Sequence, residues 1–282
     1  QNLLFEENFS YSLGQLDAVN SGANVSGGNW VNYSGTTLPI TVTSGSLTYA
    51  GYASSGIGNK VDVINGSAED AYRQFTTQSA VGSKIYAAFL INVTTTTGLA
   101  LNTSTTGDYT ISLLPSSSTS ALDARVSLRA GSVANTFNIG LRASSSNAAA
   151  VWKATDYPIN TPVLVAISYE IVSGATNDIC NLWLNPAIGS GEPSVDLTQT
   201  SASDLVDIAR LSIRQGTNSF PGQLDGIRVA TTWADAVAEP DVTPPTLSST
   251  IPADEAAGVV LNPTLSLVFS EKIAKGTGNI VI

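Results

Sequence analysis

Residues 124–129 read ARVSLR and residues 137–142 read FNIGLR, two short runs in which apolar and polar side chains alternate. Successive side chains of a β-strand point to opposite faces, so each run has one apolar and one polar face. We expect the apolar faces to be buried, and residues 130–135 to turn the chain between two strands of a hairpin. The polar face of this predicted hairpin carries Arg125, Ser127, Arg129, Asn138, Gly140 and Arg142.

The chain on both sides of this hairpin has the same character. Its apolar runs are short, rich in β-branched and aromatic residues and bounded by Gly, Ser, Asn or Thr, a pattern typical of strands. The strongest helical candidate, residues 203–209, is short. Many strands joined by turns predict an all-β, two-sheet antiparallel sandwich or jelly roll. The predicted strands are Leu3–Asn8, Ile40–Thr43, Ser46–Tyr49, Tyr72–Thr76, Lys84–Val93, Tyr109–Leu114, Ala124–Ala130, Thr136–Arg142, Val163–Val172, Ile179–Leu184, Val206–Ile213 and Leu224–Ala230.

The charge of the chain excludes several functions. Its 282 residues include 12 Lys and Arg against 22 Asp and Glu, a net charge of −10, and no histidine. Without histidine there is no Ser-His-Asp or Cys-His catalysis and no imidazole zinc site. A nucleic-acid backbone requires a basic surface, so nucleic acid is not an expected partner. No apolar run reaches the length of about eighteen residues that spans a membrane, so membrane insertion is not expected.

The composition also predicts the compartment. Only 12% of the residues are charged, so solubility depends on abundant Ser, Thr, Asn and Gly, which is common in extracellular bacterial β proteins. The start at Gln1, just before an apolar strand, fits a mature chain whose secretion signal has been removed. We therefore expect a secreted or cell-surface protein. Cys180 has no partner for a disulfide, and its alternation with Leu182 and Leu184 predicts a buried side chain.

A Pro-rich segment divides the chain. Residues 238–245 read AEPDVTPP, and three prolines within six residues favour an extended, semi-rigid linker. This gives a domain over residues 1–237, a linker over 238–245 and a second piece over 246–282. That piece has three predicted strands, too few for a sandwich core, so we expect an incomplete domain and further domains of the same polypeptide beyond Ile282. The three strands are Thr246–Ile251, Thr264–Phe269 and Asn279–Ile282.

Residues of the second piece resemble the start of the SbsA-type bacterial Ig-like domain. The resemblance depends on DVTPPTL from Asp241, IPAD from Ile251, GVVLN from Gly258, LVFSE from Leu267 and GTGNI from Gly276. It implies a module used as a spacer in secreted and surface-bound bacterial proteins.

The first 235 residues resemble, more loosely, the concanavalin A-like (laminin G-like) jelly rolls of large secreted proteins of Bacteroidetes-type bacteria. This resemblance depends on FEENF at 5–9, IYAAFLIN at 85–92, VLVAISYE at 163–170, LWLNP at 182–186, and LDGIRV at 224–229 with Trp233. It implies an architecture, because a fold does not by itself specify an activity.

The alternation also predicts a ligand-binding surface. Asn181 and Trp183 fall opposite Cys180, Leu182 and Leu184, on a polar strand face. An exposed Trp beside arginine, asparagine and glutamate side chains suits stacking on a sugar ring with hydrogen bonds to its hydroxyls. The alternative is that a loop covers Trp183 and the arginines pair with acids such as Glu170. The candidate ligand-binding residues are Trp183, Arg125, Arg129, Asn138, Arg142, Glu170 and Asn181.

The leading hypothesis is therefore a non-catalytic extracellular module that binds a glycan or another surface ligand on the concave sheet face. The alternative is a structural spacer or protein-contact module of a larger secreted enzyme or adhesin. A carbohydrate-active hydrolase is third. Glycosidases with this jelly roll, such as the laminarinase-like enzymes, place carboxylates in a Glu-x-Asp-x-x-Glu pattern on one strand, and this chain has no such pattern.

We expect either no cofactor or one structural calcium ion. Concanavalin A-like domains often hold such an ion, and calcium requires clustered oxygen ligands. Glu7, Asn8 and Asp225 belong to the first and last predicted strands, which would be neighbours in this fold. No Asp-x-Asp-x-Asp loop supports the site.

Overall fold

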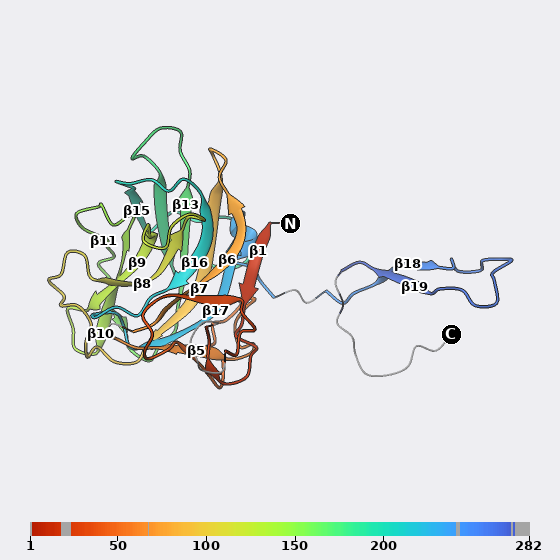
Figure 1. The fold of residues 1–282 in the computed structure, drawn as a ribbon, viewed down its shortest axis with the longest axis horizontal. Helices are drawn as coiled ribbons and strands as arrows, with labels where there is room; N and C mark the ends of the chain where they lie inside the picture. Colours follow the sequence, from red (N-terminus) through yellow and green to blue (C-terminus); the bar gives the residue numbers. More distant parts are fainter. Residues whose placement is uncertain (1, 18–23, 67, 241–242, 272, 274–282) are drawn as a thin grey trace. The chain divides into compact units, whose positions relative to one another are not determined.

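The structure is a computed structural model that describes residues 2–17, 24–66, 68–240, 243–271 and 273. The chain divides into two compact units, residues 1–240 and 241–282. In the described part of the chain, the one helix is α1, Trp233–Ala236, and the other elements are strands. The predicted all-β, two-sheet antiparallel jelly roll is confirmed (Figure 1).

Sheet 1 is the larger of the two sheets in the first unit. Its strands are β1 Leu3–Glu7, β2 Gly14–Gln15, β4 Thr41–Thr43, β5 Lys60–Val63, β7 Lys84–Val93, β13 Val163–Glu170, β14 Ile179–Leu184, β15 Leu197–Thr200 and β17 Gly222–Ala230. Their order is β15-β14-β13-β7-β17-β5-β4-β2, and β1 also pairs with β17. The first and last strands of the unit are therefore neighbours, as predicted.

Sheet 2 faces sheet 1. Its strands are β3 Trp30–Ser34, β6 Asp70–Gln78, β8 Asp108–Leu114, β9 Asp123–Ala130, β10 Thr136–Arg142, β11 Val151–Trp152, β12 Tyr157–Pro158 and β16 Ile208–Ile213. Their order is β11-β10-β9-β8-β16-β6-β3, and β12 also pairs with β10. The predicted hairpin is β9–β10, in a register that places Arg129 opposite Asn138 and Arg125 opposite Arg142.

The main core lies between the two sheets. Alternate residues of the facing strands, among them Phe89, Phe137 and Leu182, are fully buried there. Cys180 is buried in the same core, as predicted. Burying one such large apolar side chain stabilises the fold by about 1.5–3 kcal/mol.

A second apolar cluster covers the outer face of sheet 1. It includes Tyr86, Leu164 and Trp183 from the sheet, Tyr52 from the segment between β4 and β5, and Trp233 of α1. The sequence of β7 and β13 explains this arrangement, because both strands are apolar on both faces. A strand of that composition is stable only when both of its faces are buried.

The predicted strands differ from the observed ones mainly at short segments. Residues 46–49 form no strand, because their backbone donors bind side chains: the Leu47 amide donates to Asp225 (2.7 Å) and the Tyr49 amide to Ser55 (2.6 Å). Residues 203–209 form no helix. Strands β2, β3, β5, β11, β12 and β15 were not predicted. All six have five residues at most, and β2, β11 and β12 have two each, too few to show an alternation.

The described residues of the second unit form one antiparallel pair, β18 Leu247–Ile251 with β19 Ser266–Phe269. These two strands correspond to the first two strands predicted for this part of the chain. The third, Asn279–Ile282, lies outside the described residues.

Candidate ligand-binding face

Four of the seven predicted ligand-binding residues lie together on the outer face of sheet 2. Arg125 and Arg129 come from β9, and Asn138 and Arg142 from β10, in directly opposed pairs. Their neighbours in sequence, such as Val126 and Ile139, point into the main core. The alternation in the sequence therefore placed these four side chains correctly.

Trp183 does not share this face, and the expectation of an exposed Trp beside the arginines is wrong. It lies on the outer face of sheet 1 and is 1% exposed. Its ring centroid is 4.9 Å from that of Trp233, and its Nε1 donates to the Pro193 carbonyl (3.0 Å). Alternation separates inward from outward side chains but does not say to which sheet a strand belongs. Here the outward faces of β9 and β14 are on opposite sides of the sandwich.

Asn181 and Glu170 also belong to sheet 1. Asn181 is buried, and its Nδ2 lies 3.4 Å from the Ser168 hydroxyl. Glu170, at the end of β13, lies opposite Lys84 and Ile179 in the sheet register. Neither residue is near the arginines, so the pairing of the arginines with Glu170 is not observed either.

The three candidate calcium ligands do not converge. Glu7 points toward the core side of sheet 1, where it accepts hydrogen bonds from the Trp30 indole (2.8 Å) and Arg73 (2.5 Å). Asp225 lies on the covered outer side, where it accepts hydrogen bonds from the Ser46 hydroxyl (2.6 Å) and the Leu47 amide. Both carboxylates are satisfied by protein donors on opposite sides of the sheet, so they do not form a calcium site with Asn8, whose side-chain oxygen is buried without a hydrogen-bond partner among the described residues. The described residues contain no group of three or more Asp, Glu or Cys side chains able to hold a metal.

Aromatic rings and arginines form a mixed layer on the outer face of sheet 2. The guanidinium carbons of Arg125 and Arg214 each lie 4.4 Å from the Tyr109 ring centroid. Two similar pairs are Arg129 over Trp152 (4.1 Å) and Arg210 over Tyr72 (4.7 Å). We call this surface the arginine face; its members are Arg125, Arg129, Asn138, Arg142, Arg210, Arg214, Tyr72, Tyr109 and Trp152.

Small side chains form the floor beneath this layer. Ser112 of β8 and Ser212 of β16 lie opposite each other, with their hydroxyls 2.8 Å apart. Both are fully buried, whereas Tyr72 and Tyr109 are partly exposed; Trp152, also partly exposed, lies opposite Gly140. The large side chains therefore lie above the buried serines and form the surface that a ligand would contact.

Sequence reasoning missed Arg210, Arg214 and the tyrosines of this face. The signal was present, because Arg210, Ser212 and Arg214 alternate with core residues in the same way as the polar residues of β9. What could not be read was that β16 lies next to β8 in sheet 2, a pairing between segments about a hundred residues apart.

Acidic groups at one end of the arginine face are held by structural partners. Asp108 pairs with Arg214 (2.6 Å) and accepts a hydrogen bond from the Asn218 amide (3.0 Å). Asp70 is buried and accepts one from the Gln215 amide (2.8 Å). Burial raises the pKa of Asp70 to about 6, although this hydrogen bond and Arg214 oppose the shift.

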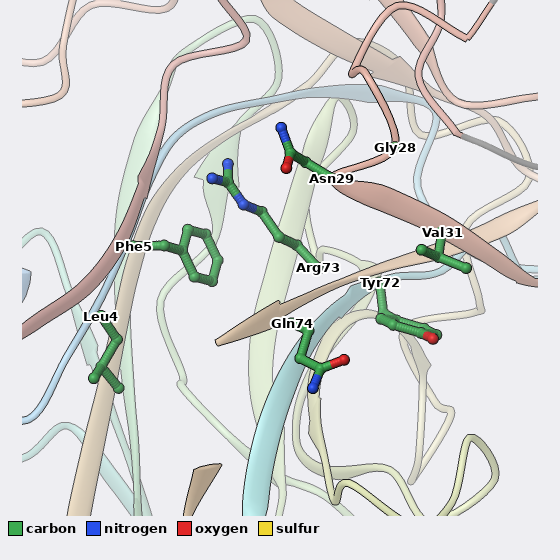
Figure 2. Close-up of a pocket in the computed structure, with 8 residues that line it drawn as sticks. All are labelled: Leu4, Phe5, Gly28, Asn29, Val31, Tyr72, Arg73 and Gln74. Atoms are coloured by element: carbon green, nitrogen blue, oxygen red, sulfur yellow. The ribbon is translucent and has the colours of Figure 1, made fainter. Parts of the chain in front are cut away.

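A pocket of about 370 Å³ adjoins the arginine face at the edge of the sandwich. Tyr72 belongs to both, and Figure 2 shows the Arg73 side chain reaching between Phe5 and Asn29. The guanidinium carbon of Arg73 lies 4.8 Å from the Phe5 ring centroid. The pocket thus combines aromatic surface with hydrogen-bond donors, and its volume lies within the range of small-ligand sites. Its lining residues are Leu4, Phe5, Gly28, Asn29, Val31, Tyr72, Arg73 and Gln74.

Comparison with protein families finds one match. Residues 241–282 match the model of a bacterial Ig-like domain, which confirms the resemblance predicted for this part of the chain. A comparison with curated proteins finds no match. In the described part of the chain, no helix is long and apolar enough to cross a membrane.

Solved structures with some likeness to the chain come from several organisms. The endo-β-1,4-glucuronan lyase of the fungus Trichoderma reesei is 12% identical, with a TM-score of 0.38 over 84% of this chain and 98% of that one. Domain 4 of AbnA, a GH43 extracellular arabinanase of Geobacillus stearothermophilus solved with arabinotriose, is 14% identical, with a TM-score of 0.36 over 82% and 93%. The globular domain of T. cruzi calreticulin is 14% identical, with a TM-score of 0.44 over 83% and 90%. At these values the likenesses carry no inference about ligand or activity.

Proposed function

We propose that the first unit is a non-catalytic, extracellular carbohydrate-binding module, and that the arginine face with its edge pocket is the binding surface. The observation that carries the proposal is the contrast between the two outer faces. Sheet 1 is sealed by α1 and the apolar cluster around Trp183. Sheet 2 presents partly exposed aromatic rings and guanidinium groups side by side. Apolar ring surface with nearby hydrogen-bond donors is what a sugar requires.

The carboxylates of the face support binding rather than hydrolysis. A hydrolase of this kind needs one carboxyl to donate a proton and a second to attack or activate water. Asp108 is ion-paired with Arg214, and Asp70 is buried against the Gln215 amide. Both groups therefore hold strand ends in place. A third carboxylate, that of Asp156, accepts hydrogen bonds from Asn138 and from the Ser132 and Val133 amides.

Binding of the full chain to a panel of immobilised neutral and acidic glycans tests the proposal. We expect retention by at least one glycan and a loss of affinity in Tyr72→Ala and Asn29→Ala, which alter the face and the pocket. The matched control is Tyr49→Ala, on the covered side of sheet 1, which should bind like the wild type. Absence of retention across the panel, or equal losses in the control, would contradict the proposal.

The second candidate function is a structural spacer or protein-contact module. The covered Trp183 favours it, and so does the match of residues 241–282 to a bacterial Ig-like domain. This function predicts that no glycan is retained, and that removing the partly exposed arginines leaves all measured binding unchanged.

A further inference from the structure

The arginine face concentrates positive charge in an acidic chain. Five of the seven arginines lie on it, and Arg73 and Arg228 are elsewhere. Arg214 makes an ion pair with Asp108. Among the described residues, the other four arginines of the face have no carboxylate within ion-pair distance; these are Arg125, Arg129, Arg142 and Arg210. These four arginines therefore make no direct ion pair, although Asp123 acts on Arg125 and Asp156 on Arg129 at longer range.

Arg125 is the most deeply buried arginine of the face, with 6% of its surface exposed. Its Nε donates to the Leu122 carbonyl (2.7 Å), but its two terminal nitrogens make no hydrogen bond within the described part of the chain. Burial lowers the pKa of Arg125, and the positive charges of Arg142 and Arg214 act in the same direction, whereas Tyr109 and Asp123 oppose the shift. These terminal nitrogens are not among the fully buried side-chain donors without a partner, so they stay accessible and can form two parallel hydrogen bonds with an external anion.

We propose that the arginine face binds an anionic sugar residue of a glycan, with Arg125 as the principal donor to its acidic group. This inference rests on the proposed function and names the class of glycan. A guanidinium pairs with a carboxylate or a sulfate through two parallel hydrogen bonds, an arrangement that a neutral sugar cannot use. Salt screens charges beyond about 8 Å at physiological ionic strength, so acidic residues farther than this from the face repel an anionic ligand only weakly.

Calorimetric titration of the full chain with three polymers tests the inference. The probes are polygalacturonate, the same polymer after reduction of its carboxyl groups to alcohols, and dextran sulfate. We expect an anionic polymer to bind about 10- to 100-fold more tightly than the reduced polymer, as for hydrogen bonds to charged groups. The preference should shrink in about 0.5 M NaCl. The first and third probes distinguish a carboxylate from a sulfate ligand.

Three variants locate the binding. Arg125→Gln and Arg129→Gln should each lose most of the preference for the anionic polymer. Arg129 is partly exposed, so it tests the face even where Arg125→Gln lowers the melting temperature. Lys60→Gln removes the same charge from sheet 1, where Lys60 donates to the Ser44 carbonyl, and should change nothing.

Four other results would overturn the inference, and each points to a different cause. Equal affinity for the anionic and the reduced polymer would refute the anionic ligand and leave carbohydrate binding intact. If the chain binds none of the three polymers and no other glycan, the proposed function is refuted as well. An equal loss in Lys60→Gln would show nonspecific attraction. Tighter binding of single-stranded DNA than of the polysaccharides would assign the face to nucleic acid instead.

Discussion

Tyr109 organises the centre of the arginine face at the scale of single residues. Two guanidinium groups lie 4.4 Å from its ring centroid, those of Arg125 and Arg214. Each such contact contributes about 0.5–2 kcal/mol, enough to favour one orientation of a long side chain. Side chains that are already fixed lose less entropy when a ligand binds, so the face is preorganised.

Trp183 has a structural role, and its removal tests that role. We expect Trp183→Ala to lower the free energy of unfolding by about 3–5 kcal/mol, because it leaves a cavity against Trp233 and Tyr86. Denaturant unfolding measures the loss. The glycan affinity of the folded variant should equal that of the wild type. A large loss of affinity with unchanged stability would show instead that Trp183 takes part in ligand binding.

Asp123 makes stability depend on pH. Burial raises its pKa in the folded chain to about 7, against about 3.9 for an unfolded Asp. Between these values the folded state keeps a proton that the unfolded state has lost, so stability falls as pH rises from about 4 to 7 and is then constant. Asp70 and Asp225, with raised pKa values of about 6 and about 7, act in the same direction.

The variant Asp123→Asn should reduce this dependence. The amide oxygen can still accept the hydrogen bond from the Ser201 hydroxyl, but no buried charge forms at high pH. Melting temperatures at about pH 5 and pH 8 should differ less in the variant than in the wild type. An identical difference in both proteins would show that Asp123 does not titrate in this range.

At the scale of elements, the hairpin β9–β10 was the part of the site that sequence could predict. Its apolar and polar residues alternate without interruption, so strand bounds, register and buried face all follow from the pattern. The unbroken apolar run of β7 indicates a cover on both of its faces. The cover on the outer face of sheet 1 also buries Trp183, two strands away on β14.

Gly140 of β10 lies opposite Trp152 of β11, so a side chain at this position should disturb both strands. A Cβ at this position would lie 2.7 Å from the Trp152 ring and 2.9 Å from the Val151 carbonyl. We expect Gly140→Ala to destabilise the fold by about 1–3 kcal/mol and to weaken glycan binding by displacing Trp152 from Arg129. In Gly191→Ala, the matched control, the added methyl meets no atom within 4 Å. Equal melting temperatures for the two variants would contradict this account.

At the scale of the whole molecule, the limit of the sequence was the assignment of strands to sheets. The outward face of each strand could be recognised. Whether the outward faces of β9 and β14 lie on the same side of the sandwich depends on pairings between distant segments. Strand β8 pairs with β16, and β7 pairs with β17, across more than ninety residues in each case. Such pairings leave no local pattern, which is why the predicted site joined residues from opposite sides of the sandwich.

The closure of the first unit by β1 and β17 provides the last prediction. The predicted calcium would sit at this closure, but Glu7 and Asp225 lie on opposite sides of sheet 1 and are bonded to protein donors. A metal that binds the folded state at a hundred times its dissociation constant adds about 2.7 kcal/mol of stability. We expect no such gain, and therefore equal melting temperatures in low-millimolar calcium and in chelator. Glu7→Gln should lower the melting temperature equally in both, because it weakens the Arg73 pair. If calcium raises the melting temperature of the wild type and Glu7→Gln abolishes this rise, a metal binds at Glu7.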